Sequence, residues 1–296
     1  MQSYIEPFGA YLAKEKKRAA NTIVSYQRDL RQFIAFLDAE GIDTTQPGRI
    51  NQTNIMAHIL FLERNGKTSA TVSRNIATLK TFFKYLLNSG VISHDPTYQI
   101  KAPKIKRKAP HSVDLNSIEL LMRQPNDSGL KGIRDRAILE LLFATGIKVT
   151  ELITLDLSDI NLSLGYIECY SGKRRRIIPM GKKAIQALQK YITHARRDML
   201  KDKHSNILFV NCNGAPFTRQ GLWKIIKAYA KKAGISDNIT PNILRHSFAM
   251  HLVSNGADME SLREMLGHSD MATTQIYFQT QTNRLREVYD KAHPRK

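Results

Sequence analysis

The chain has 296 residues, and its 45 Lys and Arg against 26 Asp and Glu give a formal net charge of +19 at pH 7. This length is enough for two domains with separate cores, and the charge predicts a polyanionic partner, either nucleic acid or an anionic membrane surface. No stretch approaches the roughly 18 consecutive apolar residues that a membrane span needs, and the first residues lack a basic region followed by an apolar one. We therefore expect a cytoplasmic protein without a membrane partner. Cys169 and Cys212 are too few for a disulfide framework or a cysteine zinc site, so we expect two free, buried thiols.

Residues 1–100 are predicted to form a helical domain, because their apolar residues recur every three to four positions. Asn21 is a candidate N-cap for a helix that ends at Gly41. A shorter helix is expected over 55–63 and a longer one over 68–88. The polar faces carry cations that are ordinary surface charges in isolation, namely Arg28, Arg31, Arg74, Lys80 and Lys84.

Residues 101–110 are predicted to form a linker, because they hold five basic residues, no acid and two prolines. Such a run is often only a solvated connector. The alternative, which is compatible with the first, is that the run follows DNA phosphates with Lys104, Lys106, Arg107 and Lys108.

Residues 111–296 are predicted to form a second domain that is mainly helical with a small sheet. Strands are expected over 166–170 and 176–179, joined by a basic turn over 172–176. Helices are expected at five places, over 130–145, 182–200, 218–232, 243–254 and 259–266.

Three motifs near the carboxyl end carry the strongest functional signal. They are Asn242-Ile-Leu-Arg245-His-Ser-Phe-Ala, Leu266-Gly-His268-Ser and Thr273-Thr-Gln-Ile-Tyr277. Far upstream, residues 144–151 read Ala-Thr-Gly-Ile-Lys-Val-Thr-Glu. Together they resemble the active-site boxes of the tyrosine recombinases, in the XerC/XerD branch and closest to its XerD members. The likeness extends almost from end to end of the chain.

The resemblance implies a two-domain DNA clamp, with a SAM-like core-binding domain over 1–100 and a catalytic domain over 111–296. It also implies a site-specific recombinase that works through a 3′-phosphotyrosine intermediate and needs no cofactor or metal. Tyr277 would be the nucleophile, Arg245 and His268 would hold the phosphate, and Lys173 would protonate the leaving 5′ oxygen. Glu151 matches an acidic position that orients the first catalytic cation, although its spacing from that cation also fits a plain surface ion pair on a helix. His246 and His251 are expected to serve packing and hydrogen bonding, and not catalysis or metal binding.

Two positions depart from the family pattern. Lys148 stands where the family has its first catalytic Arg, and Asn242 stands where it usually has His. A lysine keeps the charge but lacks the two-pronged guanidinium. We therefore expect an enzyme of reduced or specialised activity.

The implied partners are double-stranded DNA with a dif-like site, a tetramer on two such sites, a XerC-like partner and a DNA-translocase activator in chromosome-dimer resolution. With the net charge, the resemblance implies contacts to the DNA backbone and major groove from the cations of the first domain, Arg28, Arg31, Arg74, Lys80 and Lys84. DNA contacts are also expected from the basic turn, at Arg174 and Arg175. The tail from Asn283 onward is expected to dock on a neighbouring subunit. Two other functions stay open, a DNA-binding homologue that does not cut and a relaxing topoisomerase. The departures at Lys148 and Asn242 favour the first of these.

Overall fold

The computed structural model describes residues 1–103, 112–171, 174–235, 239–268, 271 and 273–278. The chain divides into two compact units, Met1–Arg107 and Lys108–Lys296. Most of the predicted linker, residues 104–110, and the predicted docking tail lie outside the described residues. Within the described part, no helix is both long and apolar enough to cross a membrane.

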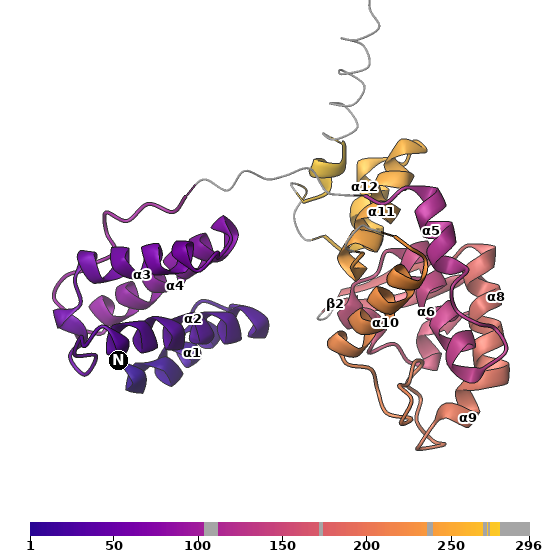
Figure 1. Cartoon of the computed structure of the whole chain (residues 1–296), viewed down its shortest axis with the longest axis horizontal. Helices are drawn as coiled ribbons and strands as arrows, with labels where there is room; N and C mark the ends of the chain where they lie inside the picture. Colours follow the sequence, from indigo (N-terminus) through magenta and orange to yellow (C-terminus); the bar gives the residue numbers. More distant parts are fainter. Residues whose placement is uncertain (104–111, 172–173, 236–238, 269–270, 272, 279–296) are drawn as a thin grey trace, which may run out of the picture. The chain divides into compact units, whose positions relative to one another are not determined.

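The first unit is a bundle of helices (Figure 1). Its described elements are η1 (Gln2–Tyr4), α1 (Ile5–Lys14), α2 (Ala20–Ala39), η2 (Pro47–Arg49), α3 (Gln52–Arg64) and α4 (Ser69–Asn88). Side chains cap two of the helices: Asn51 accepts a hydrogen bond from the Asn54 N–H, and Thr68 accepts one from the Thr71 N–H. The core is aromatic, with Phe8 against the edge of Phe82 at a centroid distance of 5.3 Å.

The predicted cap at Asn21 is wrong. Helix α2 begins at Ala20, its N-cap is Ala19, and no side chain caps it. Helix α1 was not predicted, although Ile5, Phe8 and Leu12 are buried and have helical spacing.

The second unit is mainly helical around a small antiparallel sheet, as predicted. The sheet has the order β1 (Ile160–Asn161), β2 (Tyr166–Ser171), β3 (Arg174–Pro179). Strand β3 begins at Arg174, so the predicted turn over 172–176 is too long: Arg174, Arg175 and Arg176 belong to the strand, and residues 172–173 lie outside the described part.

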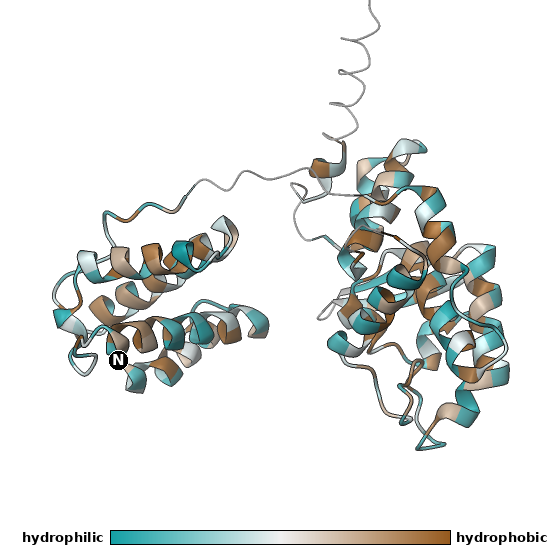
Figure 2. Cartoon of the chain, in the orientation of Figure 1, coloured by the Kyte–Doolittle hydropathy of each residue, from teal (hydrophilic) through white to brown (hydrophobic). Residues whose placement is uncertain are grey.

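The helices of this unit pack around α6, which contacts both α8 and α11 (Figure 1). Hydrophobic and hydrophilic residues alternate along most helices of both units, which is the pattern of elements with one buried face (Figure 2). The described helical elements are α5 (Leu115–Met122), α6 (Leu130–Thr145), α7 (Val149–Leu152), η3 (Leu157–Asp159), α8 (Lys182–Tyr191), η4 (Ile192–Arg196), α9 (Arg197–Met199), α10 (Arg219–Lys232), α11 (Pro241–Ser254) and α12 (Met259–Leu266).

Three details of this unit differ from the sequence analysis. The helix predicted over 182–200 contains a π-helical turn, η4, between α8 and α9. Residues 271 and 273–278 are helical, which was not predicted. Both cysteines are free, but only Cys169 is buried and Cys212 is exposed.

Candidate active site

Arg245 is buried where two helices end. Its Nη1 donates to the carbonyl oxygen of Gly146, and its Nη2 donates to that of Leu266 at 2.6 Å. These carbonyls lie at the carboxyl ends of α6 and α12, where oxygens lack partners within the helix and the helix dipole favours a cation. Arg245 therefore holds the ends of two helices together.

The helix ends can meet at Arg245 because each is followed by a glycine in the left-handed conformation. Gly146 has a φ of 57° and Gly267 a φ of 63°, a region that glycine adopts without steric cost. A Cβ at Gly146 would lie 2.3 Å from the Phe248 ring, and one at Gly267 would lie 2.7 Å from Nη1 of Arg176. Both positions therefore need glycine for space as well as for conformation.

Tyr277 points into the same part of the unit. Its side chain is 2% exposed, and its hydroxyl lies 2.6 Å from Nδ1 of His246 on α11. Burial raises the pKa of Tyr277, and the charge of Arg245 opposes that effect. The phenol is therefore protonated at neutral pH, and its oxygen is buried against α11.

His268 lies parallel to the Tyr277 ring, with centroids 6.5 Å apart and 12° between the ring planes. Its Nδ1 lies 3.0 Å from the hydroxyl of Thr274. Burial, followed by the charges of Arg245 and Lys148, lowers the pKa of His268 to about 4. His268 is therefore neutral at pH 7, where it can donate a hydrogen bond to an anion through one ring nitrogen.

Glu151 forms a buried ion pair with Arg176 of β3. The Arg176 guanidinium donates to both carboxylate oxygens, at 2.9 and 2.7 Å, and its Nε donates to the carbonyl oxygen of Met265. The Lys148 N–H also donates to Glu151, at 2.8 Å. Burial by itself raises the pKa of the Glu151 carboxyl, but these hydrogen bonds and the neighbouring cations outweigh burial and bring the pKa below its ordinary value.

The predicted site residues are thus gathered in one region as far as they are described. Tyr277 lies against His268, and the carboxyl end of α12 is held both by Arg245, at Leu266, and by Arg176 of the Glu151 ion pair, at Met265. Lys148 is close enough to shift the pKa of His268. Asn242 is exposed on α11, one turn before Arg245 and His246 and on the same face. Lys173 and the side chain of Arg174 lie outside the described residues. Arg175 forms an exposed ion pair with Glu168.

Sequence reasoning missed two residues of this region, His246 and Arg176. His246 is predicted to pack and form hydrogen bonds, but the sequence does not indicate its partner, the Tyr277 hydroxyl, which lies 31 positions away. Arg176 is predicted both at the end of the turn and at the start of the strand, and the strand assignment is confirmed, but its burial is not predicted. Strand alternation was the available signal, because Arg176, Ile178 and Met180 are all buried while the residues between them are exposed.

The cations of the first unit that are predicted to contact DNA differ in their exposure and in whether they form ion pairs. Arg28 and Lys84 are exposed, and Lys80 is half-buried. Arg31 pairs with Glu6, and Arg74 makes a two-pronged pair with buried Asp29 at 2.9 Å. The predicted contacts of the linker, Lys104, Lys106, Arg107 and Lys108, lie outside the described residues.

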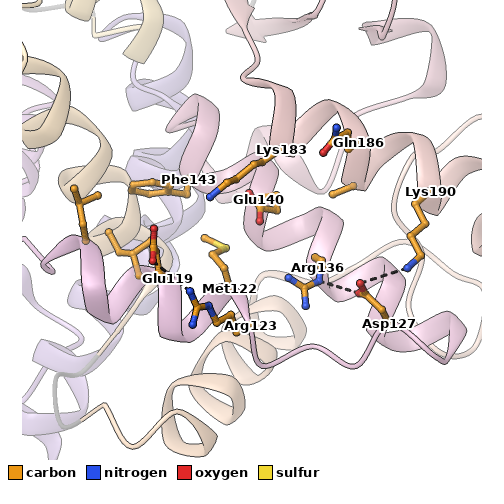
Figure 3. A pocket seen from close by; sticks show the side chains of 13 residues that line it. Glu119, Met122, Arg123, Asp127, Arg136, Glu140, Phe143, Lys183, Gln186 and Lys190 are labelled. Atoms are coloured by element: carbon orange, nitrogen blue, oxygen red, sulfur yellow. Dashed lines mark hydrogen bonds and ion pairs between the residues drawn. The ribbon is translucent and has the colours of Figure 1, made fainter.

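The second unit also has a cavity of about 570 Å³ between α5, α6 and α8 (Figure 3). Asp127 on its wall pairs with both Arg136 and Lys190. None of the predicted site residues lines it, so it is separate from the region around Tyr277. In the described part of the chain, no three His, Cys, Asp or Glu side chains are grouped to hold a metal ion.

Comparison with known proteins gives matches over the whole chain. The model of the "Phage integrase family" matches residues 111–284, and that of the "Phage integrase, N-terminal SAM-like domain" matches residues 5–90. "Tyrosine recombinase XerD" of Listeria monocytogenes serotype 4b is 43% identical over 298 residues, with 100% of both chains covered. Its namesake from Staphylococcus saprophyticus is 39% identical over 296 residues, again with 100% of both chains covered.

Two solved structures are similar as well. XerA recombinase gives a TM-score of 0.55 at 27% identity, with 99% of this chain and 100% of that chain covered. XerH site-specific recombinase bound to a palindromic difH substrate gives a TM-score of 0.74 at 21% identity, with 97% of this chain and 84% of that chain covered. At that identity the second likeness concerns the fold alone.

Proposed function

This chain belongs to the phage integrase family of tyrosine recombinases, and from that premise we propose that it exchanges DNA strands at a specific site with Tyr277 as its nucleophile. The observation that carries the proposal is the burial of the Tyr277 hydroxyl beside His246, in the region that also holds Arg245 and His268. A phenol there lies in the same region as the arginine proposed to bind the phosphate.

In the proposed reaction the Tyr277 oxygen forms a bond to phosphorus while the bond from phosphorus to the 5′ oxygen breaks. Arg245 and His268 stabilise the charge on the non-bridging oxygens, and Lys173 gives its proton to the 5′ oxygen. The 3′-phosphotyrosine keeps the energy of the broken bond, so a 5′ hydroxyl of the partner strand can displace Tyr277 without a cofactor or metal. Two rounds of exchange pass through a Holliday junction.

Lys148 and Asn242 are proposed to support the same phosphate with fewer or weaker hydrogen bonds than an arginine and a histidine. A charge-assisted hydrogen bond contributes about 1.5–3 kcal/mol, so loss of the guanidinium fork slows the transfer by about one to two orders of magnitude. Asn242 retains one neutral donor, and its effect is smaller. Glu151 would fix the start of α7, and therefore Lys148, through its hydrogen bond to the Lys148 N–H.

The first unit is proposed to hold the DNA duplex. Its contacts would come from exposed or half-buried cations on α2 and α4, and the linker and the hairpin would add phosphate contacts of their own. The residues proposed for this are Arg28, Arg31, Arg74, Lys80, Lys84, Lys104, Lys106, Arg107, Lys108, Arg174 and Arg175.

The proposed cellular role is chromosome-dimer resolution, as a tetramer on two dif-like sites with a XerC-like partner and a DNA translocase as activator. The full-length similarity to the XerD proteins supports this role. The second candidate is a homologue that binds such sites without cutting, which the departures at Lys148 and Asn242 favour.

A nicked suicide substrate tests the proposal. The parent chain is expected to form a covalent adduct at one sequence, and Tyr277→Phe is expected to bind that DNA with equal affinity and form none, because only the phenolic oxygen is removed. Binding without any adduct by the parent would support the second candidate. An adduct that persists in Tyr277→Phe would end the assignment of the nucleophile.

A further inference from the structure

Nδ1 of His246 lies 2.6 Å from the Tyr277 hydroxyl, within the range of a strong hydrogen bond. The centroids of the two rings are 5.7 Å apart, and the ring planes are tilted by 48°. His246 is half-buried on α11, directly after the arginine proposed to hold the phosphate. A proton can pass between these two atoms without any intervening group.

The neighbouring polar groups are poorly suited to accept the phenol proton. Asn242 has no basic atom, because its amide nitrogen is not protonated in water. His268 lies parallel to the Tyr277 ring, and its Nδ1 is engaged with Thr274. Arg245 and Lys148 are cations.

We infer that His246 is a catalytic residue, the general base that takes the proton from Tyr277 when the phenol attacks the phosphate. The inference rests on the proposed role of Tyr277 as nucleophile. In the forward step the O–H bond of Tyr277 breaks, the proton binds Nδ1 of His246, and the phenolic oxygen bonds to phosphorus while the 5′ oxygen leaves with a proton from Lys173. In the reverse step the His246 imidazolium returns its proton to the departing phenolate.

The surroundings of His246 suit a base that works near neutral pH. Burial and the charge of Arg245 lower the pKa of His246 below its ordinary value, so the ring is neutral at pH 7 and free to accept a proton. The titratable groups that face it are Arg245 on its own helix, His268 after α12 and Tyr277. Burial holds the pKa of Tyr277 above its ordinary value, so the attack needs a proton acceptor.

The test is single-turnover cleavage of a nicked substrate by the full chain, over a range of pH. His246→Asn keeps a polar group near the position of Nδ1 but cannot take a proton, and His246→Gln is the second variant. We expect both to bind DNA as the parent does and to cleave about 10²–10⁴ times more slowly. The parent's rate should decline as pH falls through the lowered pKa of His246, which lies below the ordinary histidine value of about 6.5, and this decline should disappear in the variants. His251→Asn, on the same helix, is the control and should cleave at the parent's rate.

Chemical rescue separates a base from a residue that only supports the fold. A 3-fluorotyrosine at position 277 is a more acidic phenol, so it should restore part of the rate in His246→Asn. In a substrate with sulfur in place of the 5′ bridging oxygen, the leaving thiolate needs no proton from an acid. This substrate should therefore restore the cleavage rate of Lys173→Ala and leave cleavage by His246→Asn slow.

Three results would overturn the inference. His246→Asn could cleave at the parent's rate with the parent's pH profile. It could also cleave faster than the parent, which would mean that the contact between His246 and Tyr277 only restrains the tyrosine in the resting enzyme. The fluorinated tyrosine could fail to restore any rate in either variant. A parent chain that forms no adduct would overturn the nucleophile and the base together, whereas a cleaving parent with unaffected His246 variants would overturn the base alone.

Discussion

The ion pair between Glu151 and Arg176 makes a sharp prediction about stability. The side chains of Glu151 and Arg176 are 8% and 5% exposed and share two hydrogen bonds. Removing one partner of a buried pair leaves an uncompensated charge and destabilises a protein by about 3–5 kcal/mol. We expect that loss for Arg176→Met, and the lower end of that range for Glu151→Gln, because the amide oxygen still accepts from Arg176.

The double variant should be no less stable than Arg176→Met alone, because neither charge remains. If the two effects were independent, the losses would add to roughly 6–8 kcal/mol. The coupling between the two positions is therefore expected to be about 3 kcal/mol or more. Losses that simply add would show that Glu151 and Arg176 act separately and would refute this reasoning.

Urea unfolding followed by tryptophan fluorescence measures these effects in the full chain. Trp223 on α10 is the sole tryptophan of the sequence, so its signal reports on the second unit. Arg175→Met is the matched control, because Arg175 is the strand neighbour of Arg176, is exposed, and pairs with Glu168 at the surface. That variant should leave the midpoint of unfolding almost unchanged.

The pH dependence follows from the lowered pKa of Glu151. A carboxyl whose pKa is lower in the folded state stabilises the fold above its unfolded pKa, about 4.3, and loses that effect as pH falls through the folded pKa. The stability difference between the parent and Glu151→Gln should be constant above about pH 5.5 and shrink below pH 4.3. A difference that grows on acidification would contradict the sign of the shift.

Two further predictions concern catalysis and DNA binding. Lys148→Arg should raise the single-turnover cleavage rate by about tenfold or more, and Asn242→His should raise it less; an unchanged rate in Lys148→Arg would mean that the pocket is built around lysine. The logarithm of DNA affinity should fall with the logarithm of salt concentration at a slope near −0.9 for each phosphate contact. Binding titrations at several salt concentrations should show a flatter slope after replacement of Lys104, Lys106, Arg107 and Lys108 by alanine, and an equal slope would leave the linker a simple connector.

Local patterns in the sequence predicted the elements well where burial has a regular period. The helix over 130–145 has the predicted bounds, and the helix over 259–266 has them too. The cap at Asn21 failed because a side chain of the right type is not sufficient. The chain must also be extended at that residue, and here Ala19 is the extended one, with a ψ of 145°.

The contacts within the site were less predictable than its residues. Motif spacing identified Arg245 and Tyr277, but nothing local indicates that Arg245 would bind the ends of two helices or that His246 would meet the phenol. Those contacts join residues 21 to 99 positions apart, so they depend on packing of the whole unit. Arg176 was predictable in principle, since strand alternation makes it face inward together with Ile178.

The two buried guanidiniums of the site differ in what neutralises them, and the difference bears on how the site meets DNA. Arg176 is paired with a carboxylate, so its charge is largely cancelled within the fold. Arg245 binds two neutral carbonyl oxygens, and within the described residues no carboxylate forms an ion pair with it. Burial lowers the pKa of Arg245, but a guanidinium remains charged in proteins. A buried charge without a counter-ion is unfavourable, so an anion that enters beside Arg245 relieves that cost, and a DNA phosphate is such an anion.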